Sequence, residues 1–268
     1  MQAATAIALT IAGSDSSGGA GVQADLKTFA ALGVYGASVI TALTAQNTMG
    51  VSGIHEVPPE FVAQQIDAVF SDLTISAVKI GMLARADVIA TVARGLDRHR
   101  ARNVVLDPVM VATSGDRLLR ADAIEALRRE LFPRALLITP NLPEAAALLE
   151  AASARTESEM QAQGEQLLAA GAKAVLIKGG HGEGSEAVDL LIDQTGVTRL
   201  AAPRISTTNT HGTGCTLSSA IAAGLAKGLP LPGAVRAAKA YVTAAIAAAT
   251  GLEVGRGHGP LHHFHAWW

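Results

Sequence analysis

The sequence predicts an α/β domain in which helices cover both faces of a mainly parallel sheet. Short apolar runs typical of buried strands alternate with amphipathic helical patterns along the whole chain, as in repeated right-handed strand-helix-strand crossovers. At 268 residues, of which 49% are hydrophobic, the chain can bury a full core. We find no linker, internal repeat or low-complexity segment, so we expect one domain over residues 1–268.

The first elements are a strand, a glycine loop, a helix and an extended stretch. Ala6–Ala12 is a short apolar run typical of a buried strand. The loop Gly13–Gly21 cannot hold regular structure, and the helical pattern of Val22–Leu32 stops at a glycine. Val34–Asn47 is rich in β-branched residues, so we expect it to be extended.

Strands and helices continue to alternate over the rest of the chain. The further strands that we expect are Ile75–Met82, Asn103–Asp107, Ala135–Thr139, Ala174–Lys178 and an antiparallel-looking pair, Ala187–Asp193 and Thr198–Leu200. The further helices that we expect are Pro59–Leu73, Asp87–Arg100, Ala121–Leu131, two helices between Glu144 and Ala174, and a last helix over Gly233–Thr250.

The stretch Asn209–Ala220 predicts a loop that runs into a helix N-terminus. Gly212 and Gly214 allow several backbone N–H groups to point at one spot, and the helix dipole adds partial positive charge there. This arrangement favours an anion. Cys215 stands at the same terminus, where we expect the pKa of its thiol to be lowered from the free value of about 8.5. The thiol is therefore a candidate base or nucleophile.

Three charged residues follow predicted strands. Asp107, Glu144 and Lys178 each stand at or just past a strand end, where open α/β sheets bind ligands. Phosphoryl transfer needs such parts: a cation and backbone amides for the moving phosphate, and carboxylates that hold Mg²⁺ directly or through water. Together with the two glycine loops, these residues predict a phosphoryl-transfer site.

Charge and cysteine content exclude several classes of protein. Lys plus Arg number 21 against 23 Asp plus Glu, so the net charge of −2 offers no electrostatic footprint for nucleic acid or an anionic membrane. We expect small molecules or copies of the chain as partners.

The single cysteine fits a reducing compartment, and we find no signal peptide or membrane-spanning run, so we expect a cytoplasmic protein.

One glycine pattern is misleading. Gly19–Ala24 has the glycine spacing of a dinucleotide-binding fingerprint, but six residues separate it from the preceding strand. The following stretch, Val34–Gln46, also contains no acidic residue to bind a ribose. A nicotinamide or flavin site is therefore disfavoured.

Seven motifs cover nearly the whole chain: Gly13–Phe29, Thr41–Thr48, Leu106–Met110, Thr139–Glu144, Ile177–His181, His211–Ala220 and Gly257–His263. In sequence and in order they resemble those of the hydroxymethylpyrimidine/phosphomethylpyrimidine kinases of thiamine biosynthesis, which belong to the ribokinase-like superfamily. The resemblance implies a three-layer α/β/α fold and an enzyme that uses ATP and Mg²⁺ to phosphorylate 4-amino-5-hydroxymethyl-2-methylpyrimidine and then its monophosphate. It also implies a homodimer.

The resemblance assigns residues to the substrate and to the metal. Gln46 matches the family's pyrimidine-binding glutamine, and Asp25 matches an aspartate of the same pocket; an amide can both donate to and accept from the edge of a heterocycle. We place Gly13 and Val109 on the same side. Glu144, in an Asn-x-x-Glu pattern, resembles the superfamily's metal-linked glutamate, and Asp107 resembles a polar group near the metal and phosphates.

The phosphate end of the expected site contains Lys178 and the second glycine loop. Lys178 looks like a phosphate contact, and we place Thr213 and Gly214 beside it as ATP-binding residues. Gly212, Gly214, Lys178 and Cys215 form the expected catalytic set. Cys215 occupies the place where most sugar kinases of the superfamily have an aspartate base. We hypothesise that it assists proton removal in the first phosphorylation, because the second acceptor is already an ionised phosphate.

Other interpretations stay open from the sequence. One alternative is a related kinase that phosphorylates pyridoxal or hydroxyethylthiazole, and another is a non-catalytic ligand sensor. A third is a cysteine hydrolase that uses Cys215 and His211, although no carboxylate lies nearby in the sequence to orient the histidine. The C-terminal histidines have no metal-site spacing that we can name, so we expect them to pack against the body of the protein. They are His258, His262, His263 and His265.

Overall fold

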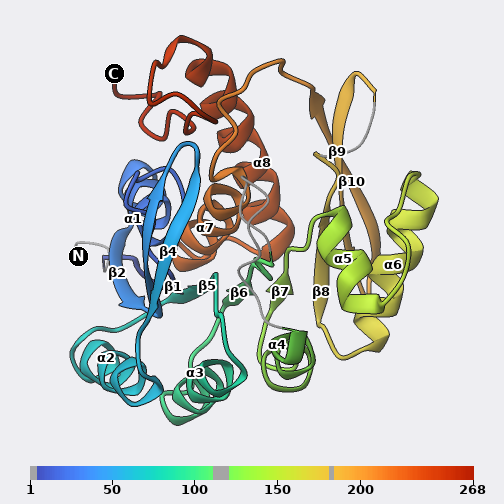
Figure 1. Cartoon of the computed structure of the whole chain (residues 1–268). Coiled ribbons are helices and arrows are strands. Elements are labelled where there is room, and N and C mark those ends of the chain that lie inside the picture. The colour runs from blue at the N-terminus through green and yellow to red at the C-terminus, as the bar shows by residue number, and fades with distance from the viewer. Residues whose placement is uncertain (1–4, 111–120, 181–183) are drawn as a thin grey trace.

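A mixed eight-stranded sheet forms the centre of the computed structural model, which describes residues 5–110, 121–180 and 184–268 (Figure 1). The strand order is β10-β9-β8-β7-β6-β5-β1-β2. Within this sheet, β2, β1, β5, β6, β7 and β8 are parallel, whereas β9 runs antiparallel to both of its neighbours. The strands are β1 (Ile7–Ala12), β2 (Tyr35–Ile40), β5 (Ala77–Ile80), β6 (Val104–Leu106), β7 (Leu137–Ile138), β8 (Ala174–Lys178), β9 (Glu186–Asp193) and β10 (Gly196–Pro203).

Helices cover both faces of this sheet and make a three-layer arrangement (Figure 1). One face packs against α1 (Gly21–Ala31), α7 (Thr213–Ala226) and α8 (Leu231–Ala248). The other packs against α2 (Pro59–Asp72), α3 (Ala86–Arg98), α4 (Ala121–Ala126) with its π-helical extension Leu127–Leu131, α5 (Leu142–Leu149) and α6 (Glu157–Ala169). A 3₁₀ turn, Ala249–Gly251, follows α8.

The alternation of side chains along each strand divides the core into two layers. On β6, Val105 belongs to the cluster under α1, α7 and α8, whereas Val104 and Leu106 belong to the cluster on the opposite face. All three side chains are buried. Apolar runs without polar alternation are what a sheet covered on both faces requires, so the predicted fold class is confirmed.

The stretch Val34–Asn47 is extended, as predicted, but it does not form a single strand. It divides at Thr41 into β2 of the main sheet and β3 (Ala42–Asn47), which pairs with β4 (Gly50–Glu56) in a separate hairpin. Thr41 fixes the exit from the sheet, because its N–H donates to Ala12 and its hydroxyl to the Met82 carbonyl. Strand β4, with two glycines, gives little sequence signal and is not predicted.

The tip of this hairpin rises toward the C-terminal segment that follows α8 (Figure 1). The Thr48 carbonyl accepts a hydrogen bond from the His258 N–H, and the Thr48 hydroxyl accepts from the N–H groups of Arg256 and Gly257. The C-terminal segment therefore holds the hairpin tip. Of the histidines expected to pack against the body, His262 and His263 are buried, whereas His258 is exposed. Within the described ranges, no helix has the length and apolar character that crossing a membrane requires.

Candidate active site

The carboxyl ends of the parallel strands bring the predicted charged residues together. Asp107 directly follows β6, Lys178 ends β8, and Glu144 lies in the first turn of α5, just past β7. The Lys178 Nζ lies 2.7 Å from Asp107 Oδ1 and 3.7 Å from Glu144 Oε2. Thr139 and Ser218 also donate hydrogen bonds to the Asp107 carboxylate. The cluster that the sequence predicts at this edge is therefore present.

Burial and mutual charge set the protonation of this cluster. Burial alone would raise the pKa of Asp107, but the ammonium groups of Lys178 and Lys79 outweigh it and hold that pKa below its usual range. Burial would lower the pKa of Lys178, yet Asp107 and Glu144 hold it above its usual range. For Glu144, burial and the nearby Asp107 outweigh Lys178 and raise the pKa to about 7.

Glu144 has a second task in the helix that carries it. Its Oε2 accepts a hydrogen bond of 2.7 Å from the N–H of Asn141, whose Oδ1 accepts one of 2.9 Å from the N–H of Glu144. This capping box starts α5 and is what the Asn-x-x-Glu pattern encodes. The helix start therefore fixes where the carboxylate points.

The second glycine loop forms the N-terminus of α7. Gly212 is the N-cap, with a φ of 82° that favours glycine. A Cβ at Gly214 would lie 3.2 Å from the Lys178 Nζ and 3.6 Å from Asp107 Oδ2, so the helix start lies directly over the charged pair. The hydroxyl of Thr213 donates to the Thr210 carbonyl at 2.7 Å. Backbone N–H groups at a helix start beside a lysine can hold an anion.

Cys215 stands in the first turn of α7, but its expected acidity is wrong. Burial raises the pKa of the thiol to about 11, and the carboxylates of Asp25 and Asp107 add to this rise. Lys79 and the Gly21 N–H act in the opposite direction and do not balance it. The helix dipole therefore does not decide the protonation state, and the thiol is protonated at neutral pH.

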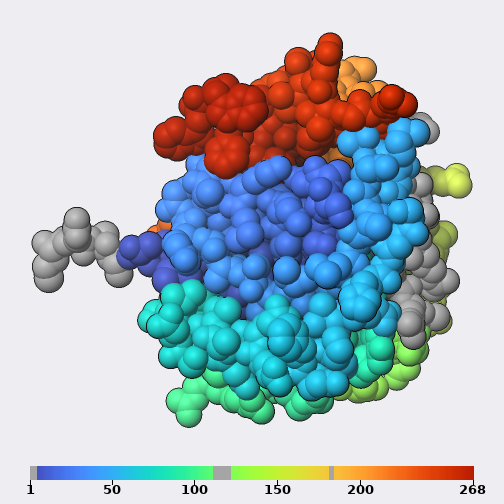
Figure 2. Space-filling model, turned by 60° about the vertical axis from the view of Figure 1, so that its left-hand side comes forward, coloured from blue at the N-terminus to red at the C-terminus, as the bar shows by residue number. Residues whose placement is uncertain are grey.

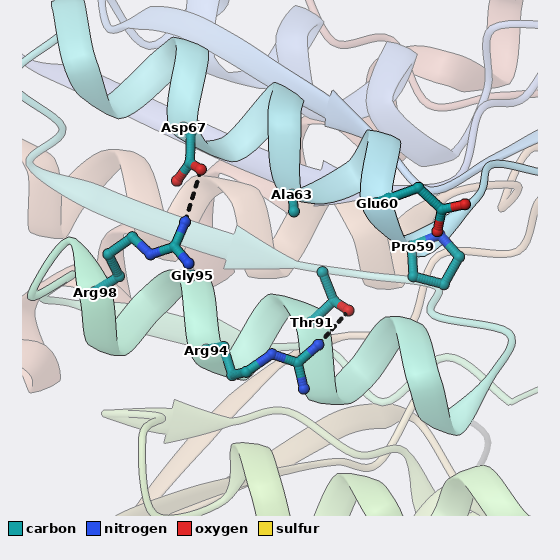
Figure 3. Close-up of a pocket in the computed structure, with 8 residues that line it drawn as sticks. All are labelled: Pro59, Glu60, Ala63, Asp67, Thr91, Arg94, Gly95 and Arg98. Carbon is teal, nitrogen blue, oxygen red and sulfur yellow. Dashed lines mark hydrogen bonds and ion pairs between the residues drawn. The ribbon is translucent and has the colours of Figure 1, made fainter.

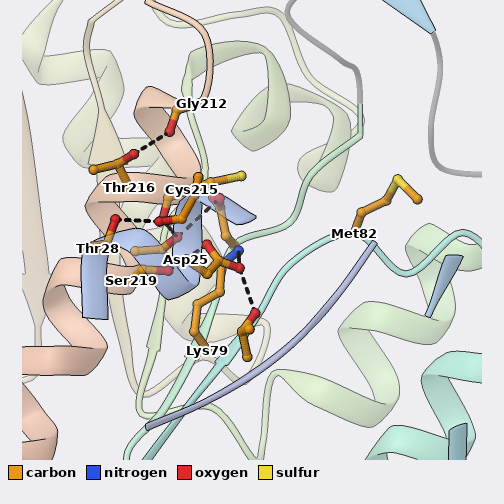
Figure 4. Close-up of polar contacts among 12 residues, drawn as sticks. Asp25, Thr28, Lys79, Met82, Gly212, Cys215, Thr216 and Ser219 are labelled. Carbon is orange, nitrogen blue, oxygen red and sulfur yellow. Dashed lines mark hydrogen bonds and ion pairs between the residues drawn. The ribbon is translucent and has the colours of Figure 1, made fainter. Parts of the chain in front are cut away.

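Asp25 lies beneath Cys215 and is enclosed by the chain itself (Figure 4). Its side chain is 0% exposed and pairs with Lys79 at 2.8 Å. Hydroxyl groups of Thr10 and Ser219, each at 2.6 Å, complete its hydrogen bonds. These partners hold the carboxylate in place below the thiol. The direct contact with a substrate that we expect from the sequence stays a prediction.

Sequence reasoning misses Lys79. It lies in the middle of β5 with its side chain 0% exposed, between apolar neighbours. Burial would lower its pKa, but the carboxylates of Asp25 and Asp107 raise it above the usual range, so the side chain carries a charge. A lysine inside an otherwise apolar strand was the available signal, since a buried lysine requires a partner.

The residues expected on the pyrimidine side lie around the ends of β1, β3 and β6. Gln46 is half-buried on β3 at a bulge between Ala45 and Gln46, where a strand can redirect a side chain. Its Oε1 accepts a hydrogen bond of 3.1 Å from the Thr44 hydroxyl. Gly13 follows β1, and the Val109 N–H donates to the Asp107 carbonyl. His181, the last residue of the fifth motif, lies outside the described residues.

A separate cavity of about 260 Å³ lies between α2 and α3 (Figure 3). Arg94 donates to Thr91 on one side of it, and Arg98 pairs with Asp67 on the other. Its lining contains none of the residues expected to bind substrate or phosphate. The cavity lies among helices that cover the sheet rather than at the strand ends, so we do not assign the active site to it.

Comparisons with known proteins show the family that the chain resembles. The sequence model of the phosphomethylpyrimidine kinase family matches residues 15–262. A hydroxymethylpyrimidine/phosphomethylpyrimidine kinase of Rhizobium meliloti is 64% identical over 264 residues, which cover 98% of this chain and 99% of that protein.

Solved structures share the fold over most of the chain. An ADP complex of Bacillus subtilis pyridoxal kinase has a TM-score of 0.91 and 37% identity, covering 98% of this chain and 99% of that one. Phosphomethylpyrimidine kinase from Clostridium difficile has a TM-score of 0.79 and 45% identity, covering 90% and 99%. The ribokinase-like fold implied by the motifs is confirmed, and the chain belongs to the phosphomethylpyrimidine kinase family.

Proposed function

We propose that this chain uses ATP to phosphorylate 4-amino-5-hydroxymethyl-2-methylpyrimidine and then its monophosphate, on the path to thiamine diphosphate. The observation that carries the proposal is the 64% identity, over nearly the full length, to a kinase named for both substrates. The cluster of Asp107, Glu144 and Lys178 below the start of α7 supplies the parts that phosphoryl transfer needs.

The phosphates of ATP bind at the start of α7. The N–H groups of Gly212, Thr213 and Gly214 donate to phosphate oxygens, and the Lys178 ammonium neutralises the charge that develops during transfer. Lys178 is suited to this because Asp107 already fixes its position at 2.7 Å. Gln46, Gly13 and Val109 contact the pyrimidine ring on the opposite side of the site.

Glu144 and Asp107 are the residues that would hold Mg²⁺, mainly through water. No three or more of the described histidine, cysteine, aspartate and glutamate side chains gather into a site that could hold a metal by themselves. Both carboxylates contact Lys178, and the described contacts of Glu144 use only Oε2. This donor set fits a cation that keeps several waters and binds phosphate oxygens. Bound there, Mg²⁺ would neutralise phosphate charge.

In its thiolate form, Cys215 accepts the hydroxymethyl proton in the first step. The thiol must first lose its own proton, so the raised pKa limits this role to a small ionised fraction at neutral pH. If Cys215 is the base, Cys215→Ala slows the first phosphorylation and leaves the second nearly unchanged, while Cys215→Asp retains first-step activity. Full first-step activity in the alanine variant excludes the role.

The proposed activity is tested by pyrimidine-dependent ATP consumption together with the mass of the product. We expect one added phosphate early in the reaction and two at completion. ATP consumption that does not depend on the pyrimidine, or none at all, contradicts the proposal and favours a non-catalytic ligand sensor.

A pyridoxal-type alcohol is the second candidate substrate, because a pyridoxal kinase matches the fold with a TM-score of 0.91. Its identity of 37% is well below the 64% of the pyrimidine kinase. A direct panel of pyridoxal, hydroxyethylthiazole and the hydroxymethylpyrimidine decides between them. Strong turnover of pyridoxal without turnover of the pyrimidine would reverse the assignment.

We also propose a cytoplasmic homodimer of single-domain chains. The face shown in Figure 2 joins N-terminal segments to α2 below and the C-terminal segment above. Exposed apolar side chains stand on elements of the N-terminal part: Tyr35, Leu43, Met49, Ile54 and Phe61. We propose that these side chains are covered in the dimer, since contact between copies removes apolar surface from water. Sedimentation at micromolar concentration tests the dimer, and a monomer at all concentrations contradicts it.

A further inference from the structure

A buried histidine–aspartate pair joins the two glycine loops. The Nε2 of His211 lies 2.7 Å from Asp15 Oδ2, and the two side chains are 7% and 1% exposed. Burial alone would raise the pKa of Asp15, but hydrogen bonds from His211 and Ser17 outweigh it and hold that pKa below the usual range. An ionised carboxylate only accepts hydrogen bonds, so Nε2 carries the proton and donates it.

The same carboxylate organises the first glycine loop. Asp15 Oδ1 accepts from the N–H and the hydroxyl of Ser17, at 2.9 and 2.7 Å. Asp15 Oδ2 accepts from the N–H groups of Gly19 and Ala20, at 3.0 and 2.8 Å. One buried side chain therefore fixes the backbone of residues 17–20, immediately before α1.

His211 connects this loop to the start of α7. It precedes Gly212, where a Cβ would lie 1.9 Å from the Gly19 carbonyl oxygen. A Cβ at Gly19 would lie 2.4 Å from Cδ2 of His211. The His211 N–H also donates to Gly259 in the C-terminal segment at 3.0 Å. The position of the imidazole thus determines how closely the two loop backbones approach.

We propose that Asp15 and His211 are positioning residues, which hold the loop of residues 13–21 against Gly212. In this position, the backbone amide groups at the phosphate-binding start of α7 face the acceptor in a fixed arrangement. The proposal rests on the kinase function given above. Neither side chain touches the reacting groups. The pair acts between the first glycine loop on the acceptor side and the second glycine loop on the phosphate side, which lie far apart in the sequence.

Loss of the pair should lower kcat more than it changes KM. A displacement of about 1 Å in a catalytic arrangement can cost about 100-fold in rate. We expect His211→Leu to reduce kcat of the first phosphorylation by about 10- to 100-fold, with the KM for ATP changed by less than about threefold. His211→Gln should recover most of this loss, because its amide can donate to Asp15.

The chain offers a matched control on the far side of the sheet. His99 Nε2 also lies 2.7 Å from a carboxylate oxygen, that of Asp67, between α3 and α2. We expect His99→Leu to leave kcat within about twofold of wild type, since it removes a similar contact outside the site. If His211→Leu does not fold, Asp15→Asn tests the same contact. It should lower kcat, but by less than the loss expected for His211→Leu.

Hydrogen exchange measures the coupling of the loops without any substrate. In His211→Leu, the amides of residues 17–20 and 212–214 should exchange faster than in wild type, and in His99→Leu they should not. The proposal is overturned if hydrogen exchange in residues 17–20 is unchanged in His211→Leu, or if that variant keeps the wild-type kcat. It is also overturned if His211→Gln loses as much kcat as His211→Leu. A wild-type chain that does not phosphorylate the pyrimidine refutes the kinase assignment, while exchange still decides whether the pair holds the loops together.

Discussion

At the scale of single residues, Cys215 shows how enclosure changes the chemistry of a side chain. The chain contains one cysteine, so its total reactivity toward iodoacetamide reports this thiol alone. The sequence places the thiol at a helix start, which favours its ionised form. The structure adds burial and two carboxylates, which favour the neutral form and raise the pKa to about 11.

We predict that alkylation of Cys215 rises about tenfold per pH unit above pH 7, because only the thiolate reacts. The rise should continue toward pH 11, the pKa given by the structure. Asp25→Asn removes a negative charge that disfavours the thiolate, so it should shift the profile to lower pH. A midpoint below about 8.5, the value of a free thiol, contradicts the raised pKa.

A second prediction at this scale concerns the contribution of the Lys79–Asp25 pair to stability. Both side chains are 0% exposed, and removing one partner of such a pair leaves an uncompensated buried charge. We expect Lys79→Met to lower the free energy of unfolding in urea by about 3–5 kcal/mol. Adding Asp25→Asn should recover part of the loss, because the amide needs no counter-charge.

A surface ion pair supplies the control for this measurement. Arg98 and Asp67 lie 2.7 Å apart with side chains 62% and 44% exposed. Arg98→Met should cost at most about 1 kcal/mol, since exposed pairs are screened by water. Equal losses in Arg98→Met and Lys79→Met would mean that burial does not govern the buried pair.

At the scale of elements, the hairpin β3–β4 depends on its contact with the C-terminal segment. A Cβ at Gly257 would lie 1.9 Å from the Thr48 carbonyl oxygen, so Gly257→Ala must push the hairpin tip away. Because β3 carries Gln46, we predict a higher KM for the pyrimidine and a loss of about 1–3 kcal/mol in stability. Steady-state kinetics and urea unfolding measure these two effects.

Gly251 provides the comparison for Gly257. It lies a few residues earlier in the same part of the chain, and a Cβ there would meet nothing within 4 Å. Gly251→Ala should therefore leave both the KM and the stability close to wild type. A similar rise in KM for both variants would show that the effect does not pass through Thr48.

The same elements show what sequence reasoning could and could not predict. Strands such as β1 and β8 were predictable because short, mainly apolar runs between helical patterns leave few alternatives. The capping box at Asn141 was local and visible. Lys79 and Asp25 are 54 positions apart, and Asp15 and His211 are 196 positions apart. Only the folded chain brings such partners together, so a local pattern can indicate that Lys79 needs a partner but not which residue supplies it.

At the scale of the whole molecule, one sheet connects the N-terminal and C-terminal parts. Strands β1 and β2 lie at one end of the strand order and β9 and β10 at the other. We predict a single cooperative unfolding transition. Both tryptophans, Trp267 and Trp268, lie in the C-terminal segment, so fluorescence reports that segment while circular dichroism reports the helices. The two curves should coincide, and an earlier fluorescence transition would show that the segment detaches on its own.

The division of the core between the two faces has a consequence for synthesis on the ribosome. Helices α2 to α6 cover their face as the chain emerges, but α7 and α8, which cover most of the other, come last. Until they emerge, buried residues such as Val105, Leu137 and Leu176 face solvent in the growing chain. An unfinished chain of this kind exposes an apolar sheet surface and is prone to aggregate. Translation pauses before α7 should therefore increase the chain's demand for chaperones.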